Sequence, residues 1–266
     1  MLNKVHFDAD NYASSGLFIS TPVVNANSAA VNLKGSFINR GQGKRKLSIS
    51  HKIYDAEGKI FVEKTSQINL NPGQKSDFLQ EFKNIKGQHL WSIDDPYLYR
   101  VVSTISDAST NEKLDESVQP LGFRWYSFDA DKGFFLNGKY VKLVGASRHQ
   151  DFKAMRNALP TTIHVHDVEL LKQMGGNFLR IAHYPQDPAV IEACDRLGIL
   201  TSIEAPIMNR ITETPEFATN SKQMQLEMMR QNYNHPSLAS NLQTMRRFNL
   251  TYCLKIYVAK LYLFRR

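Results

Sequence analysis

Residues 177–204 read NFLRIAHYPQDPAVIEACDRLGILTSIE and contain one complete strand–helix–strand pattern. The first five residues are mostly apolar and predict a buried strand. Asp187 follows as a helix N-cap, whose carboxylate can accept a free backbone N–H, and Pro188 fits the first helical position. Gly198 predicts the end of the helix, and 199–203 predicts a second buried strand. A helix between two apolar strands indicates parallel pairing and therefore an α/β fold.

The same alternation extends to both sides of this stretch. Upstream, 141–146 predicts a strand and 162–174 predicts a helix. The apolar stripe of that helix consists of Ile163, Val168, Leu171 and Met174. Downstream, 221–233 predicts a further helix, and a fourth strand opens at Leu238. This order forms either a doubly wound sheet or an eightfold barrel, and in both folds the ligand site lies beyond the carboxyl ends of the strands.

Polar side chains follow three of the predicted strands at the point where each strand ends. His149 and Asp151 follow the first strand, His183 and Tyr184 follow the second, and Glu204 follows the third. A single histidine in a loop is usually a surface residue. Because the carboxyl ends of parallel strands meet at one edge of a sheet, three polar ends in succession favour one shared binding site.

The first half of the chain has a different pattern. Between 16 and 121, short segments alternate apolar and polar residues and are separated by turns, such as those at 55–58 and 71–73. The inward faces are predicted to carry Val31, Leu33, Phe37, Leu47, Ile49, Ile53, Tyr99, Val101 and Ile105. About seven strands over roughly 100 residues predict an antiparallel sandwich of immunoglobulin-like type. A hairpin around Asn137-Gly138 then opens the second pattern.

The charge of the chain is concentrated near its end. Of the net charge of +8, residues 241–266 contribute +6 and the other 240 residues +2, so the body lacks the basic surface of a nucleic-acid-binding protein. No segment approaches the ~20 apolar residues of a membrane span, and the first 20 residues contain no signal-peptide run. We expect no nucleic-acid or membrane partner, and a cytoplasmic location unless a longer parent protein is exported. Cys194 and Cys253 are too few for a disulfide framework or a zinc site.

Eight short motifs stand in a fixed order along the chain. They are LWS at 90–92, PYLY at 96–99, GFR at 122–124, FLNGK at 135–139, GASRHQD at 145–151, RIAHYP at 180–185, CDRLG at 194–198 and NHPS at 234–237. Each is weak evidence alone, whereas the ordered set is specific. Over about residues 15–240, the set resembles the β-galactosidases and β-glucuronidases of glycoside hydrolase family 2.

The resemblance implies an immunoglobulin-like β-sandwich followed by the first part of a catalytic (β/α)8 TIM barrel. We expect the sandwich at 15–121 and a partial barrel of about three and a half βα units at 122–240. Residues 1–14 are then an N-terminal remnant, too short for the jelly roll that precedes the sandwich in the family. The family pattern stops at residue 240, so 241–266 form a basic tail foreign to the family.

The same resemblance implies sugar binding without catalysis in this chain. In relatives, NHPS leads into a strand that ends in Asn-Glu, and this Glu is the acid/base, whereas 241–244 read NLQT here. The nucleophilic Glu of a later strand has no counterpart either. Retaining hydrolysis needs both carboxyl groups, about 5 Å apart. The residues expected to hold sugar hydroxyls of a β-glycoside are His149, Asp151, His183, Tyr184 and Glu204.

No metal or cofactor is expected. Met208 and Arg210 stand where some β-galactosidases carry magnesium ligands, and neither side chain is a ligand that magnesium prefers.

Two other interpretations stay open. The chain could be a non-catalytic carbohydrate-binding or interaction module, which sugar binding without turnover would favour. The basic tail could instead bind nucleic acid or a membrane surface. An out-of-frame end would also lack acidic residues, and we favour that explanation of 241–266. The sequence does not indicate an oligomeric state.

Overall fold

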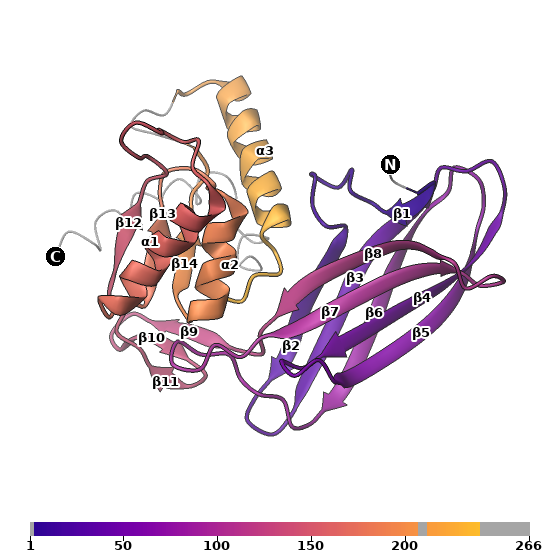
Figure 1. Ribbon diagram of the computed structural model, residues 1–266, viewed down its shortest axis with the longest axis horizontal. Helices are drawn as coiled ribbons and strands as arrows, with labels where there is room; N and C mark the ends of the chain where they lie inside the picture. The colour runs from indigo at the N-terminus through magenta and orange to yellow at the C-terminus, as the bar shows by residue number, and fades with distance from the viewer. Residues whose placement is uncertain (1–2, 207–211, 240–266) are drawn as a thin grey trace.

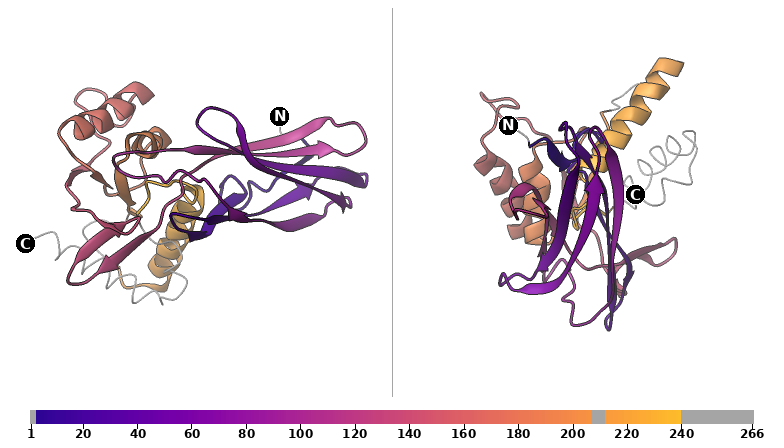
Figure 2. Two further views of the ribbon diagram at one scale, coloured as in Figure 1. Left: turned by 90° about the horizontal axis from the view of Figure 1, so that it is seen from below. Right: turned by 90° about the vertical axis from the view of Figure 1, so that its right-hand side faces the viewer.

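The structure, a computed structural model, describes residues 3–206 and 212–239. Strands β1 to β8 form an elongated β-sandwich (Figure 1). Two small sheets and three helices follow, and the helices gather at one end of the sandwich, as the left view of Figure 2 shows. The basic tail at 241–266, Cys253, Met208 and Arg210 lie outside the described residues. No helix within the described ranges is long and apolar enough to cross a membrane.

Two four-stranded antiparallel sheets make up the sandwich. In the first sheet, β3 (Ala29–Asn39) pairs with β1 (Val5–Phe7), β2 (Leu17–Val24) and β6 (Lys75–Ile85). The second sheet has the order β5 (Ile60–Leu70), β4 (Arg45–Tyr54), β7 (Tyr99–Asp107) and β8 (Lys113–Leu121). The predicted immunoglobulin-like sandwich is confirmed.

The period-two pattern of the central strands places their apolar side chains between the two sheets. All the residues predicted to face inward are buried, namely Val31, Leu33, Phe37, Leu47, Ile49, Ile53, Tyr99, Val101 and Ile105. Burial of apolar surface of this kind is the main favourable term in folding, at roughly 25 cal/mol per Å². The alternation therefore fixes which face of each strand meets the core.

One strand of the sandwich lies where the sequence pattern does not predict a strand. Val5–Phe7 pairs with residues 37–39 of β3, and the Phe7 N–H donates to the Asp115 carboxylate of β8 at 2.8 Å. This short strand therefore contacts both sheets. All three residues of β1, including His6, are buried, and a segment of three residues is too short to establish a period of two.

The second part begins with an antiparallel sheet that contains the predicted hairpin. It consists of β9 (Tyr126–Asp129), β10 (Gly133–Leu136) and β11 (Lys139–Tyr140). Asn137 and Gly138, which connect β10 to β11, both have positive φ angles, as a tight turn of this type requires.

A parallel sheet follows, with the order β12-β13-β14. Its elements are β12 (Gly145–Arg148), α1 (Thr161–Gln173), β13 (Phe178–Ile181), α2 (Pro188–Leu197), β14 (Leu200–Ile203) and α3 (Pro215–Gln231). A parallel bridge between Thr201 and Leu238 marks the opening of the fourth strand. This is the first part of a (β/α)8 barrel, as predicted.

Helix α2 has the predicted ends. The Asp187 carboxylate accepts the Ala189 N–H at 2.9 Å, Pro188 is the first helical residue, and Gly198 adopts the left-handed conformation after the last turn. Within the helix, Cys194 is buried and free, and burial raises the pKa of its thiol. This cysteine therefore behaves as a small core residue.

Two helices differ from their predictions. Met174 was expected in the buried stripe of α1 but is 77% exposed, because the helix ends before it and leaves it at the C-cap. His164 is buried on that face instead. Helix α3 begins at Pro215, six residues before its predicted start, because the Thr214 hydroxyl accepts the Phe217 N–H and caps the helix there.

Strand β12 also begins later than the predicted residue 141. The Asn177 side chain accepts the Val144 N–H at 2.8 Å and donates to the Lys142 carbonyl at 2.9 Å. These side-chain bonds take the place of strand pairing, so the ladder starts at Gly145.

The sandwich and the barrel part are joined by buried polar contacts. The Trp91 indole N–H donates to the Asp195 carbonyl of α2 at 2.8 Å. The Arg124 guanidinium donates to the carbonyls of Pro236 and Leu238, the latter at 2.7 Å, which holds the segment that opens the fourth strand. Burial lowers the pKa of Arg124, and the two carbonyl oxygens accept from its Nε and Nη2 inside the interface.

Asn234 makes a second set of contacts across the same interface. Its amide nitrogen donates to the Leu17 carbonyl at 2.9 Å and to the Gln119 side chain at 2.8 Å. Its oxygen accepts the Ile19 N–H, also at 2.9 Å. A single side chain thus bonds to strands of both sheets.

Gly198→Ala tests how closely the two parts pack. A Cβ at Gly198 would lie 2.4 Å from the Ile93 carbonyl oxygen, at a φ of +67°. We expect the free energy of unfolding to fall by about 3 kcal/mol or more, since a backbone clash adds to the roughly 1–2 kcal/mol of the left-handed conformation. Gly175→Ala is the matched control, because its φ is +83° and nothing lies within 4 Å. If urea denaturation shows that both variants lose the same free energy of unfolding, the close contact between Gly198 and Ile93 is contradicted.

Candidate functional site

The parallel sheet divides its side chains between two faces. Ser147, Arg180 and Ser202 are paired across the three strands and share one face. Arg148 and Ile181, the next residues along β12 and β13, lie on the opposite face, which the helices cover. The first face therefore corresponds to the inside of the barrel, and it carries a charged side chain.

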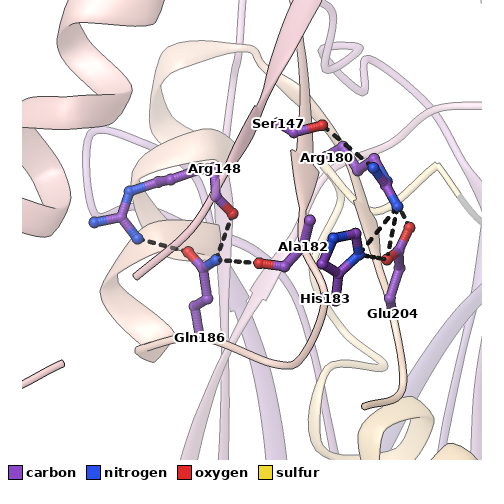
Figure 3. A network of polar contacts seen from close by, with 7 residues as sticks. All are labelled: Ser147, Arg148, Arg180, Ala182, His183, Gln186 and Glu204. Carbon is purple, nitrogen blue, oxygen red and sulfur yellow. Dashed lines mark hydrogen bonds and ion pairs between the residues drawn. The ribbon is translucent and has the colours of Figure 1, made fainter. Parts of the chain in front are cut away.

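An arginine–glutamate pair occupies this inner face. Arg180 Nε lies 2.6 Å from Glu204 Oε1, and Arg180 Nη2 lies 3.0 Å from Glu204 Oε2. His183 Nδ1 is 3.0 Å from Glu204 Oε2, and Arg180 also reaches the Ser147 hydroxyl at 3.5 Å (Figure 3). The Glu204 side chain is only 14% exposed, and the two-bond contact with the guanidinium fixes its orientation.

His149 lies beside this pair. Its ring centroid is 5.0 Å from that of His183, in an edge-to-face arrangement. The structure thus brings together three of the five residues predicted from the sequence: His149, His183 and Glu204. Asp151 is exposed and Tyr184 half-buried, and within the described ranges neither makes a hydrogen bond or ion pair with those three.

The sequence prediction of the site omitted Arg180. The signal was present, because Arg180 is the one charged residue in the otherwise apolar strand Phe178–Ile181. A charge in a buried parallel strand needs a partner, and here the partner is a residue that had been predicted, Glu204.

The arrangement is suited to binding hydroxyl groups. Glu204 and the rings of His149 and His183 offer acceptors, and Arg180 and Ser147 offer donors, close together at one edge of the sheet. Both Glu204 oxygens are engaged by Arg180, and Glu204 Oε2 and Arg180 Nη2 also lie within hydrogen-bond distance of His183 Nδ1. Within the described ranges, no group of three His, Cys, Asp or Glu side chains could hold a metal ion.

Two family models together match most of the chain. Residues 13–124 match the model described as glycosyl hydrolases family 2, and residues 130–240 match the family 2 TIM barrel domain. The chain belongs to glycoside hydrolase family 2. The family resemblance of the sequence motifs is therefore confirmed.

The relatives of this family 2 chain include two curated enzymes and a solved structure. A β-glucuronidase of Bacteroides fragilis is 35% identical over 86% of this chain and 33% of its own length. A β-galactosidase of Bacteroides ovatus is 32% identical over 75% of this chain and 23% of its own length. The crystal structure of a Bacteroides uniformis β-glucuronidase is 42% identical, with a TM-score of 0.86, over 88% of this chain and 28% of that chain. The chain spans about a third or less of the length of these relatives.

Glu204→Gln tests whether the arginine–glutamate pair is a structural requirement. Replacement leaves Arg180 without a charged partner in a partly buried position, so we expect the free energy of unfolding to fall by about 1–3 kcal/mol. Glu63→Gln is the matched control, since Glu63 pairs with Lys52 at 3.5 Å on the exposed surface of the sandwich. That change should cost less than about 0.5 kcal/mol. If denaturant titration shows the same small loss for both variants, the pair is not holding the inner face together.

Proposed function

We propose that the chain binds the sugar ring of a β-glycoside at the carboxyl ends of β12, β13 and β14. The observation that carries this proposal is the Arg180–Glu204 pair with His183 at the inner face of a family 2 barrel domain. In this proposal, His149, Asp151, His183, Tyr184 and Glu204 hold sugar hydroxyls, and Arg180 fixes the carboxylate that accepts from them.

The names of the relatives support the substrate class. They include β-glucuronidases and β-galactosidases, so the proposed ligand is a β-linked pyranoside of uronate or hexose type. The corresponding enzyme type is a retaining O-glycosyl hydrolase. In the same proposal the sandwich at 15–121 and the barrel part at 122–240 are the two domains of the binding unit.

We further propose that these 266 residues hydrolyse no glycoside. A retaining enzyme needs one carboxyl group to protonate the leaving oxygen and a second, about 5 Å away, to attack the anomeric carbon. Glu204 is committed to Arg180 and His183, and 241–244 read NLQT where the family resemblance implies Asn-Glu. The chain thus binds carbohydrate without hydrolysing it, as a carbohydrate-binding module does.

The test is binding without turnover. Isothermal titration with methyl β-D-glucuronide and methyl β-D-galactoside should show millimolar binding of at least one, as expected for a few hydrogen bonds near −4 kcal/mol. Arg180→Ala should abolish it. Arg196→Ala is the control, because Arg196 is an exposed arginine on α2, away from the inner face. A panel of nitrophenyl β-glycosides should be cleaved no faster than in buffer.

Two results would contradict the proposal. Binding that is unchanged in Arg180→Ala would place the ligand elsewhere. Turnover that persists through purification and disappears in Glu204→Gln would show that Glu204 is a catalytic group.

A further inference from the structure

A second polar network lies directly behind the site, on the helix-covered face of the sheet. Arg148 is 8% exposed, and its Nε donates to Asp167 of α1 at 2.9 Å. Its Nη2 lies 3.1 Å from His164 Nδ1, and its Nη1 donates to the Gln186 side-chain oxygen at 2.5 Å. Because that oxygen faces a guanidinium, the orientation of the Gln186 amide is fixed: its NH2 group points the other way.

The NH2 group of Gln186 reaches two backbone carbonyls from different loops. It donates to the Arg148 carbonyl at 2.6 Å and to the Ala182 carbonyl at 3.1 Å (Figure 3). The Ala182 N–H also donates to the Arg148 carbonyl at 3.1 Å, so the loops meet at this point. Each carbonyl belongs to the residue immediately before a site histidine, His149 in one loop and His183 in the other.

We propose that Gln186 is a positioning residue that holds His149 and His183 in the geometry needed to bind sugar. It contacts neither ring, and it acts through the backbone of Arg148 and Ala182. Its importance for ligand binding rests on the proposed function, whereas its effect on the two rings can be measured without ligand.

An amide side chain can accept one hydrogen bond and donate two others, and position 186 requires both. Gln186 must accept from Arg148 and also donate to two carbonyls. A carboxylate of the same length would keep the first contact and would replace the two donors by an oxygen that repels both carbonyls. Gln150, in the first of these loops, is used differently, because its side-chain oxygen accepts the Asp187 N–H at 2.8 Å. A carboxylate can fill that role.

The experiment therefore compares Gln186→Glu with Gln150→Glu in the full chain. The ring protons of His149 and His183 are close enough for a nuclear Overhauser effect, given the 5.0 Å between ring centroids. We expect wild type and Gln150→Glu to show it. In Gln186→Glu it should weaken about threefold or more, for a displacement of roughly 1 Å, the scale at which misplaced groups lose function. Binding of methyl β-D-glucuronide should weaken about tenfold in the same variant only.

The outcomes separate the two proposals. An unchanged inter-ring effect in folded Gln186→Glu overturns the positioning role, whatever the ligand data show. If wild type retains the inter-ring effect but binds neither methyl glycoside, the proposed function fails and the positioning of the rings stands. If Gln186→Glu does not fold, Gln186→Met decides, because it has similar length and no charge. A wild-type inter-ring effect in that variant would overturn the proposal.

Discussion

The buried hydrogen bonds of Asp195, in α2, are the interactions on which the arrangement of the two parts depends. Its carboxylate is 3% exposed and bonds to the His235 ring at 2.5 Å and to the Ser237 N–H at 2.9 Å, while its backbone carbonyl accepts from Trp91 of the sandwich. One residue therefore fixes the sandwich, a barrel helix and the segment leading to the fourth strand. A buried carboxylate is tolerated only when its oxygens are satisfied in this way. Two side chains of the NHPS motif at 234–237 are thus explained by packing, since Asn234 bonds to both sheets of the sandwich and His235 bonds to Asp195.

Because side chains alternate along a parallel strand, the proposed ligand-binding residues lie on one face of the sheet and the residues that hold the loops lie on the other. Arg180 and Arg148 are both arginines near the ends of neighbouring strands, yet they point to opposite faces of the sheet. On the inner face Arg180 holds Glu204, which has the proposed role of accepting from sugar hydroxyls. On the outer face Arg148 is covered by α1 and donates a hydrogen bond to Gln186, which fixes the orientation of that amide. The charged inner face and the braced outer face are therefore consequences of one alternation, and a shift of register by one residue would exchange them.

Much of this organisation could be predicted from the sequence, because it depends on local patterns. The inward faces of β3, β4 and β7, the caps of α2 at Asp187 and Gly198 and the turn at Asn137-Gly138 all follow from period, capping and turn chemistry. His149, His183 and Glu204 were found because parallel strands bring their ends together. The exposure of Met174 and the contacts of Gln186 could not be predicted in the same way, because they depend on the exact last turn of α1 and on a bond to a residue 38 positions away in the chain. The early start of α3 does have a local signal, which the sequence prediction omitted: Thr214 and Pro215 are an N-cap residue and a first-turn proline, like Asp187 and Pro188 of α2.

In the proposed function, the ends of β12, β13 and β14 form the ligand site of this family 2 chain. Residue-resolved chemical-shift mapping tests it most directly, with methyl β-D-glucuronide titrated into protein labelled at histidine and arginine side chains. A ligand at these strand ends should cause saturable shifts of the His149, His183 and Arg180 side chains. A contradictory result would be shifts confined to the groove between the sandwich and α2, which is lined by residues including Arg100 and Arg196.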